Sequence, residues 1–464
     1  MITGYGVIYL GLSIVILAAG QGTRMRSDLP KVLQLLAGKP LLAHVLECAS
    51  DLAADDICVV YGHGGEKVKT VFSDSDIRWV LQAEQLGTGH AVQQAMPDIP
   101  SGNRVLILAA DVPLLQPITL HRLLEKTPDT DMSVLTVDID DPTGYGRIVR
   151  NNVGISRIVE QNDASKDELF LTEINTGVIL CPSEWLKNWL ANLSNDNSQG
   201  EYYLTDVIAM AVTDGINVHG IKADSSVEVM GINDKKQMAE AERVLQARLV
   251  DELMTEGVGF ADPGRVDIRG TLSCGKDVFI DVNAVFEGDV HLGDGTKIGP
   301  NNLIRDSKLG EGNIIHSNCH IEDASTGSHC EIGPFARLRP GAVIANEVKI
   351  GNFVEVKKST IASGSKVNHL TYIGDAEIGS DVNVGAGTIT CNYDGVNKHK
   401  TIIGDNASIG SNVNLVAPVS VGKGATIGAG STISRSVPEG GLTVARAKQK
   451  NIEGWVRPNK KEAK

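Results

Sequence analysis

The chain has 464 residues, of which 42% are hydrophobic, 22% charged and only 4% aromatic, and its net charge is −14. This length exceeds a single ordinary hydrophobic core, so we expect two folded domains and a connection between them. An acidic chain without a long basic run is poorly suited to nucleic acid. We therefore expect no nucleic-acid partner, and small phosphorylated ligands held by local lysines and arginines.

Seven cysteines are scattered along the chain, and none forms a Cys-x-x-Cys pair. An odd number without paired spacing predicts reduced thiols and argues against a structural zinc site. The sequence therefore favours a cytoplasmic protein.

The amino-terminal stretch from Met1 to Gly20 has no charged residue and is long enough to span a membrane. However, no basic residue precedes it, glycines interrupt it, and no cleavage-like site follows it. We therefore expect no membrane span. Instead we expect a loose extension of about twelve residues before a buried strand at Ser13–Leu17.

A glycine-containing loop follows this strand, with the sequence Ala-Ala-Gly-Gln-Gly-Thr-Arg-Met from Ala18 and a Pro-Lys pair ending at Lys31. Gly20 and Gly22 also fit a dinucleotide-binding turn, but the third glycine of that fingerprint is absent. Backbone N–H groups with Arg24 and Lys31 nearby suit a nucleoside triphosphate instead. The complete string resembles the signature loop of sugar-1-phosphate nucleotidyltransferases.

Strand and helix patterns then alternate, which predicts an α/β sheet with ligands at the carboxyl ends of its strands. We expect helices such as Leu41–Leu52 between strands at Ile57–Val60, Ile77–Leu81, Val105–Ala109 and Met132–Val137. Two motifs follow such strands: Gln-Ala-Glu-Gln-Leu-Gly-Thr-Gly, starting at Gln82, has groups that can read a base, and Asp111 is suited to hold Mg²⁺. By itself, a strand-end aspartate is more often a cap or turn residue.

Polar motifs continue in order after this point. They are Asp-Pro-Thr-Gly-Tyr-Gly-Arg ending at Arg147, Glu160, Glu-Ile-Asn-Thr-Gly from Glu173, Gly-Glu-Tyr-Tyr-Leu-Thr-Asp ending at Asp206, and Gly-Ile-Asn ending at Asn233.

The next segment, from Asp234 to Glu256, has apolar residues at helical spacing, which predicts one long helix. Its apolar side is more typical of packing than of partner binding, and consists of Ala241, Val244, Leu245, Leu249 and Leu253. We expect a rigid arm at residues 235–257, between domains at 1–234 and 258–464.

Aliphatic residues recur every six positions in the second half, at Ile403, Ile409, Leu415, Val421, Ile427 and Ile433. Neither a helix nor a strand repeats every six residues, so the spacing predicts short straight segments separated by corners. Four of these residues are followed directly by glycine, which accepts the backbone conformations of corners. The pattern predicts a β-helix of hexapeptide repeats from about Gly270 to about Arg435, because a disordered Gly-rich tail would have no periodic aliphatic column.

The repeat is interrupted by Thr-Cys-Asn-Tyr-Asp-Gly-Val-Asn-Lys-His-Lys, which ends at Lys400, and it resumes at Ile403. A loop that leaves a rigid solenoid is a natural position for chemistry. Arg339, Lys357 and Lys398 are suited to clamp a sugar phosphate, although each of them alone is more typical of a solvated face of the solenoid.

From about Ser13 to about Pro458, the loop, the ordered motifs and the β-helix closely resemble one family, the bacterial bifunctional N-acetylglucosamine-1-phosphate uridyltransferases and glucosamine-1-phosphate acetyltransferases. The resemblance implies a Rossmann-like α/β nucleotidyltransferase domain and a left-handed parallel β-helix, joined by the long helix. It implies acetyl transfer from acetyl-CoA to glucosamine 1-phosphate, followed by uridylyl transfer from UTP to N-acetylglucosamine 1-phosphate. It also implies Mg²⁺ and a homotrimer.

In the first half, the resemblance implies that Asp111 and Asn233 bind Mg²⁺. In-line attack on the α-phosphorus of UTP would then rely on positioning and on the charges of Mg²⁺, Arg24 and Lys31. Contacts to the nucleotide and the sugar phosphate are implied for Leu17, Ala18, Ala19, Gly20, Lys31, Gln82, Gly87, Thr88, Ala109, Asp111, Gly146, Glu160, Asn175 and Asn233.

The chain departs from the family at one place. The family usually has Tyr-Gly directly before the metal aspartate, whereas this chain has Ala109 and Ala110. Loss of the aromatic ring removes a packing or hydroxyl contact, and a methyl group at Ala110 can obstruct close backbone approach, which would weaken uridylyl transfer. The metal carboxylate of Asp111 is retained, so the sequence leaves the size of this effect open.

In the second half, the resemblance implies that His369 is the catalytic base. The amine of glucosamine 1-phosphate must lose a proton as it attacks the thioester, and an imidazole titrates near neutral pH. Sugar-phosphate contacts are implied for Arg339, Lys357, Tyr372, Asn383 and Lys398. Acetyl-CoA contacts are implied for Ala386, Asn392, Tyr393, Ser411, Ala429 and Arg446, with the interrupting loop reaching a site partly built from another subunit.

Two other functions fit part of the sequence. One is a nucleotidyltransferase whose β-helix is only regulatory or oligomerising, and the set of His369, Tyr372 and the Asn392-Tyr393 loop argues against it. The other is a non-enzymatic trimer scaffold, and the intact Gly20, Lys31, Asp111 and Asn233 argue against that.

Overall fold

The computed structural model describes residues 11–20, 22–62, 65–73 and 76–457. It contains two compact units, residues 1–245 and 246–464, and the boundary lies within helix α7 (Lys235–Thr255). Most of the expected amino-terminal extension lies outside the described residues. The division at 1–234, 235–257 and 258–464 stays a prediction.

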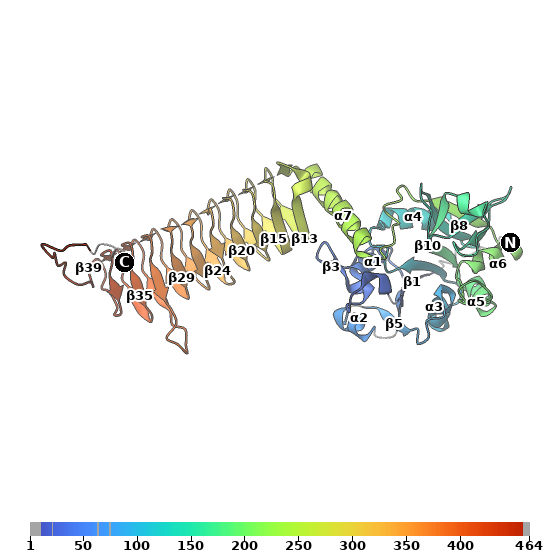
Figure 1. The fold of residues 1–464 in the computed structure, drawn as a ribbon, viewed down its shortest axis with the longest axis horizontal. Helices are drawn as coiled ribbons and strands as arrows, with labels where there is room; N and C mark the ends of the chain where they lie inside the picture. The colour runs from blue at the N-terminus through green and yellow to red at the C-terminus, as the bar shows by residue number, and fades with distance from the viewer. Residues whose placement is uncertain (1–10, 21, 63–64, 74–75, 458–464) are drawn as a thin grey trace, which may run out of the picture. The chain divides into compact units, whose positions relative to one another are not determined.

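A mixed sheet forms the centre of the first unit, with the strand order β11-β7-β10-β6-β1-β4-β5 (Figure 1). The central strand β1 pairs in parallel with β4 on one side and with β6 on the other. The strands expected from the sequence are confirmed, with bounds β1 (Leu12–Ala18), β4 (Asp56–Tyr61), β5 (Arg78–Leu81), β6 (Arg104–Ala109) and β7 (Met132–Asp138).

The sequence did not predict the reversal of strand β10 (Glu173–Pro182), which runs antiparallel to both β6 and β7. Its register shifts between Asn175 and Ile179, as at a β-bulge. A hairpin of β8 (Arg147–Arg150) and β9 (Ile155–Val159) pairs with β10, and β11 (Val218–Lys222) pairs in parallel with β7. The hairpin of β8 and β9 therefore lies beside the first residues of β10.

Helices cover both faces of this sheet, because alternate residues of β1 enter different cores. Ile14 packs with residues of α1 and α4, whereas Val15 packs with residues of α3, α5 and α6. Such burial on both faces explains the continuous apolar run of β1. The helices are α1 (Leu41–Ser50), α2 (Glu66–Val71), α3 (Thr88–Ala95), α4 (Pro117–Lys126), α5 (Ser183–Ala191) and α6 (Asp206–Thr213).

The apolar stripe of α7 is used for packing, as the sequence predicted. Ala241 belongs to a buried cluster of the first unit together with Leu114, whereas Leu253 belongs to the core of the β-helix. The side-chain amide of Gln246 also exchanges two hydrogen bonds of 2.7 Å with the backbone of Ile268. Each end of the helix is therefore anchored in the unit to which it belongs.

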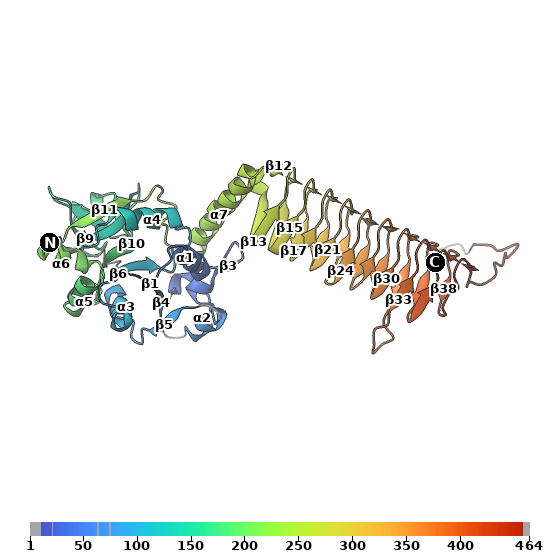
Figure 2. The ribbon, with the colours of Figure 1, turned by 180° about the vertical axis from the view of Figure 1, so that it is seen from behind.

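The second unit is a parallel β-helix of stacked coils that contains one sheet of 11 strands and one of 17 (Figure 2). The six aliphatic residues from Ile403 to Ile433 are at most 3% exposed, so the period of six is a buried column as predicted. The stack is longer than expected: β12 (Gly259–Phe260) already pairs with β14 (Phe279–Ile280), and β39 (Leu442–Thr443) pairs with β37 (Thr426–Ile427).

Two general findings concern the described residues as a whole. None of their helices is both long and apolar enough to cross a bilayer. All seven cysteines are free thiols.

Strand β33 (Thr401–Ile403) offers a test of the buried column. Ile403 is 2% exposed and its neighbour Ile402 is 42% exposed. We expect Ile403→Ala to lower the free energy of unfolding of the β-helix by about 2–5 kcal/mol, because it leaves a cavity between coils. Ile402→Ala is the control and should cost much less. Urea titration of both variants measures the difference, and equal losses would contradict the column.

Candidate active sites

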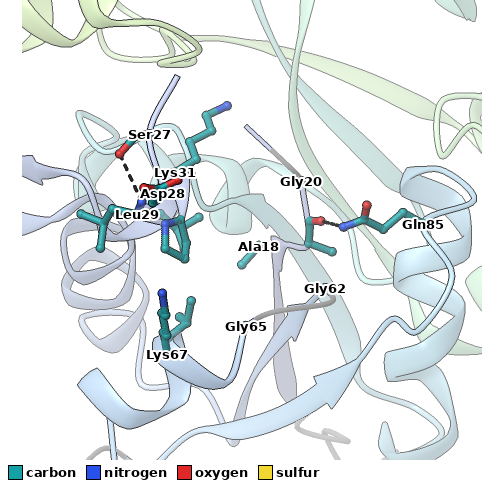
Figure 3. Close-up of a pocket in the computed structure, with 14 residues that line it drawn as sticks. Ala18, Gly20, Ser27, Asp28, Leu29, Lys31, Gly62, Gly65, Lys67 and Gln85 are labelled. Carbon is teal, nitrogen blue, oxygen red and sulfur yellow. Dashed lines mark hydrogen bonds between the residues drawn. The ribbon is translucent and has the colours of Figure 1, made fainter. Parts of the chain in front are cut away.

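Two cavities flank the loop that follows β1. The first has a volume of about 330 Å³ and lies between the segment Ser27–Lys31 on one side and Gly20 and Gln85 on the other (Figure 3). Lys67 of α2 also lines it. The second cavity, of about 420 Å³, is lined by Gln82, Gln85, Gly87, Thr88 and Glu201. Because Ala19, Gly20 and Gln85 line both cavities, the loop separates two adjoining spaces.

The side chain of Gln85 is hydrogen-bonded to this loop. Its side-chain amide donates to the carbonyl oxygen of Ala19, and Figure 3 shows the contact. A Cβ atom at Gly62 would lie 2.5 Å from the Gln85 amide nitrogen and 2.7 Å from the Ala19 carbonyl oxygen. Glycine at this position therefore permits the close approach. The sequence alone does not point to Gln85 or Lys67, although Gln85 lies inside the motif that begins at Gln82.

The second cavity has a rigid wall. The Gln82 amide donates to the carbonyl oxygen of Gly87 at 3.1 Å. Gly87 has a φ of 109°, and a Cβ atom there would lie 2.6 Å from the carbonyl oxygen of Tyr202. The start of α3 thus packs against the Gly-Glu-Tyr-Tyr motif, and Leu204 donates its N–H to the Thr88 hydroxyl at 3.1 Å. Two motifs that are distant in sequence form one wall here.

A cluster of cations and oxygen ligands lies beside the loop. The Lys31 ammonium contacts the Asp111 carboxylate and donates to the Asn233 side-chain oxygen at 2.9 Å. Arg24 donates to the same oxygen of Asn233 at 2.9 Å. Asp111 and Asn233 thus place two oxygens around one positive charge, which is the arrangement that a hard divalent cation also requires. The described residues contain no group of three or more His, Cys, Asp or Glu side chains arranged for a metal ion.

Three of the residues predicted to contact the sugar phosphate, Gly146, Glu160 and Asn175, lie together at the hairpin, whereas the fourth, Asn233, lies in the Lys31 cluster. Asn175 donates its backbone N–H to the Gly146 carbonyl oxygen at 2.9 Å, and its side-chain oxygen accepts from Gly177 at 3.0 Å. A Cβ atom at Gly146 would lie 3.5 Å from the Glu160 carboxylate. Thr205 donates its hydroxyl to Glu160 at 2.9 Å, a partner that the sequence did not suggest.

Burial raises the pKa of Glu160 above its ordinary value, and the carboxylates of Asp206 and Asp163 act in the same direction, while the hydrogen bond from Thr205 opposes them. Burial likewise raises the pKa of Asp206, with a further contribution from Asp163. Ionising Glu160 inside the folded protein therefore costs free energy.

Ala109 and Ala110 lie at the end of β6, where Ala109 pairs with Leu17. The Ala110 side chain is 1% exposed and packs in the core, and its φ is not positive. Neither alanine lines either cavity. The methyl group of Ala110 therefore packs into the core and narrows neither of these two cavities.

A column of charged residues runs along one face of the β-helix. Arg269, Glu287, Arg305 and Glu322 occupy equivalent positions in successive coils, and each arginine is paired with a neighbouring glutamate. The next two positions are cationic, because Arg339 and Lys357 follow the paired residues Leu338 and Val356. The strict alternation of charge along the column ends there.

This cationic end contains three of the predicted sugar-phosphate residues. Contact with the Lys398 ammonium group lowers the pKa of Lys357 below its ordinary value. Arg339 donates to Glu355 at 2.7 Å, and Tyr372 is paired with Glu355 in the next coil. An anion placed beside Lys357 and Lys398 would relieve their repulsion.

The interrupting loop joins this end of the solenoid. It lies between β32 (Ile389–Cys391) and β33, and Asn392 donates its amide to Asp375. The Tyr393 side chain is 61% exposed. The loop therefore projects Tyr393 away from the core.

His369 lies at a different corner, at the end of β28 (Lys366–His369). Backbone hydrogen bonds connect this corner from coil to coil: Gly387 donates to His369, Asn412 to Ala386, and Gly430 to Ser411. The Arg446 guanidinium continues the series by donating to the Ala429 carbonyl oxygen at 2.7 Å. The predicted base and four predicted acetyl-CoA residues thus form one line, His369, Ala386, Ser411, Ala429 and Arg446.

A cavity of about 530 Å³ lies beside His369 and extends toward earlier coils. Its lining includes Asn352, Asn368 and a charged group of His316, Glu331 and Lys349, none of which the sequence singled out. The predicted residues Arg339, Lys357, Asn383 and Lys398 do not line this cavity. One chain by itself therefore brings the predicted acetyltransferase residues into two sets.

Comparison with known proteins identifies both units. A family model described as a MobA-like NTP transferase domain matches residues 14–163, and one described as bacterial transferase hexapeptide (six repeats) matches residues 273–306 and 400–435. A nucleotidyltransferase sheet and a hexapeptide β-helix in one chain define a transferase with two activities.

Whole-length relatives give the family. Three proteins named Bifunctional protein GlmU are similar to this chain: 54% identity over 450 residues for Azoarcus sp. (strain BH72), 55% over 452 residues for Idiomarina loihiensis, and 54% over 450 residues for Marinobacter nauticus. Each match covers 97% of this chain and at least 99% of the relative. The chain belongs to the GlmU family of bifunctional enzymes, which are uridyltransferases and acetyltransferases.

The buried Glu160 gives a prediction for stability. Because its folded-state pKa is raised, its protonated form stabilises the fold at low pH, and this contribution is lost as the pH rises through the raised pKa. We therefore expect Glu160→Gln to raise the unfolding temperature of the first unit at pH 8 and to have little effect at pH 4. Calorimetry at both pH values measures the change in unfolding temperature. Glu184→Gln, at the exposed start of α5, is the control. A lower unfolding temperature at pH 8 would contradict the prediction.

Proposed function

We propose that the β-helix transfers the acetyl group of acetyl-CoA to glucosamine 1-phosphate, and that the α/β unit then transfers the uridylyl group of UTP to N-acetylglucosamine 1-phosphate. Support comes from one observation above all: each unit contains its own candidate site, built from its own residues. These sites are the Lys31 cluster with the two loop cavities, and the His369 corner with the Lys357–Lys398 pair.

In uridylyl transfer, an oxygen of the sugar phosphate attacks the α-phosphorus of UTP, and the bond to the β-phosphate breaks to release pyrophosphate. Gln82 and Gly87 would face the uracil in the second cavity, and backbone groups at Gly20 would face the phosphates. Lys31 and Arg24, which lie together beside the loop, would neutralise the negative charge that approaches them. Glu160 and Asn175 would orient the sugar. Catalysis then depends on positioning and on charge.

The pair Asp111 and Asn233 fits Mg²⁺, because their oxygens already converge on one cationic group, the Lys31 ammonium. Few protein ligands are needed when substrate phosphates supply others. When bound, Mg²⁺ would add positive charge beside the triphosphate. Lys31 would then exchange its contact with Asp111 for contact with the nucleotide.

In acetyl transfer, the amine of glucosamine 1-phosphate attacks the thioester carbonyl, and His369 accepts the proton that the amine loses. Lys357 and Lys398 would hold the phosphate, since they are close enough to repel each other. The line of small residues Ala386, Ser411 and Ala429 leaves room for a long ligand along the corner, and Arg446 at its end would meet a phosphate of coenzyme A.

The free cysteines fit a reducing compartment, the cytoplasm.

A homotrimer is supported by an apolar corner next to the His369 cavity. Phe335 and Phe353 stack in successive coils with ring centroids 5.3 Å apart, and Leu370 follows in the next coil. These three residues are 49%, 54% and 61% exposed and have φ values of 57°, 56° and 47°. Bulky residues rarely adopt this conformation, and other coils have asparagine or glycine at such corners. A second copy of the chain that covers this corner would lie beside His369 and could bring the other set of predicted residues to it.

A single reaction mixture tests the two activities. Purified protein with glucosamine 1-phosphate, acetyl-CoA, UTP and Mg²⁺ should produce UDP-N-acetylglucosamine, measured by mass spectrometry. His369→Ala should form none from this mixture, since it lacks the base, yet should use N-acetylglucosamine 1-phosphate and UTP at the wild-type rate. Accumulation of N-acetylglucosamine 1-phosphate by the wild type would instead mean that the Ala109–Ala110 strand end has disabled uridylyl transfer.

The corner residues give a test of assembly. Phe353→Asn keeps a residue that tolerates a positive φ but removes the exposed ring. We expect it to shift the sedimentation of the protein from trimer toward monomer and to lower acetyl transfer, with uridylyl transfer unchanged. Val343→Asn, at an exposed strand position of the β-helix outside both the corner and the interrupting loop, is the control for loss of an apolar surface residue. A wild-type protein that sediments as a monomer would contradict the homotrimer.

A further inference from the structure

We propose that Asn352 is a positioning residue for His369, and that its side-chain oxygen holds the imidazole with the proton on Nδ1 and the lone pair on Nε2. The inference rests on the proposed role of His369 as the base in acetyl transfer. The two residues are 17 positions apart and lie in adjacent coils, where the His369 Nδ1 and the Asn352 Oδ1 are 2.9 Å apart. Nδ1–H donates and the amide oxygen accepts.

The backbone around this pair is fixed by the stack. Asn352 and His369 are register partners in the pairing of β25 (Lys349–Asn352) with β28, and Leu370 donates its N–H to the Asn352 carbonyl oxygen at 3.0 Å. The Thr371 hydroxyl donates to the His369 carbonyl oxygen at 2.7 Å. The remaining freedom of His369 is rotation of its side chain, and the contact with Asn352 restricts that rotation.

The neighbouring coils offer no alternative partner at this corner position. Pro334 occupies it in the coil before Asn352, and Ala386 occupies it in the coil after His369. Neither side chain has a polar group. Without the Asn352 amide, the exposed imidazole would be free to turn and to exchange its two ring nitrogens.

The charged groups that face the same cavity are engaged with one another. Glu331 accepts from Lys349 at 2.8 Å through one oxygen, and its other oxygen lies 3.1 Å from Nε2 of His316. Both oxygens of the only carboxylate in the cavity lining are thus occupied. His369 is therefore oriented by a neutral acceptor, whereas a carboxylate at the same place would favour the imidazolium form.

The chemical step needs this orientation. As the amine nitrogen forms its bond to the thioester carbonyl carbon, its proton passes to Nε2 of His369. The carbon–sulfur bond then breaks, and the departing thiolate of coenzyme A takes the proton back from Nε2. An imidazole that already has its proton on Nε2 could not accept the amine proton at that nitrogen. A partner that keeps the proton on Nδ1 therefore keeps Nε2 available as the base.

Three variants test the proposal by steady-state acetyl transfer at pH 5.5 to 9. We expect Asn352→Ala to lower kcat by about 10-fold to 100-fold, which does not exceed the lower end of the roughly 10²–10⁴-fold that a general base contributes, and to change KM for both substrates by less than about twofold. Asn352→Asp keeps an acceptor for Nδ1–H and should retain most of kcat. The fall of kcat on the acid side of its pH profile should move to higher pH, because a carboxylate favours the protonated imidazole. Asn414→Ala, an exposed asparagine of β35 (Asn414–Val416) outside the cavity, is the matched control and should behave as wild type.

Uridylyl transfer and the unfolding temperature of each variant report whether the protein is folded. A wild-type kcat for Asn352→Ala would overturn the proposal, and so would an Asn352→Asp profile that coincides with that of the wild type. His369→Ala separates this failure from failure of the proposed function. If His369→Ala abolishes acetyl transfer while Asn352→Ala does not affect it, only the role of Asn352 is wrong.

Discussion

The β-helix depends on one constraint, the stacking of each buried aliphatic side chain on its counterpart in the next coil. Because the column from Ile403 to Ile433 is almost fully buried, a coil cannot slip without exposing its apolar residues. The same register then fixes the surface side chains in columns of their own. The charged column that ends at Lys357 and the corner that holds His369 are two of these. Additional residues are accommodated only where they leave the stack at a corner, as the segment between β32 and β33 does.

The α/β unit reaches its site by a different route. Its parallel strands end at one edge, where the β1 loop lies beside the end of β6, and tertiary contacts add residues from remote segments. Lys31 meets Asp111 and Asn233, which are 80 and 202 positions away in the sequence. The antiparallel strand β10 and its hairpin supply Gly146, Asn175 and Glu160. Burial at this place also opposes ionisation of Glu160 and raises its pKa.

Local patterns predicted most of the fold, and the exceptions have physical causes. Strands β1, β4, β6 and β7 and helix α7 lie where their apolar periodicity indicates. Burial of a strand on both faces, or of a helix along one side, produces a recognisable apolar pattern in the sequence. The direction of β10 produces no such pattern, since a strand buried between two neighbours has the same composition in either orientation. The start of the stack at β12 also escaped prediction, because the position six residues before Ile268 is Asp262 and not an aliphatic residue. Sequence also does not tell which way the methyl group of Ala110 points, and the structure packs it into the core.

The sequence by itself determined the two architectures, the order of the motifs and the chemical types of the candidate residues, because these depend on periodicity and on short strings. The tertiary structure alone decided which side chains meet. It paired Asn352 with His369, Gln85 with the Ala19 carbonyl group, Thr205 with Glu160, and Lys357 with Lys398. Most of these partners are separated by a full coil or by several strands. Their contact is set by the register of stacked backbones, which no local pattern encodes.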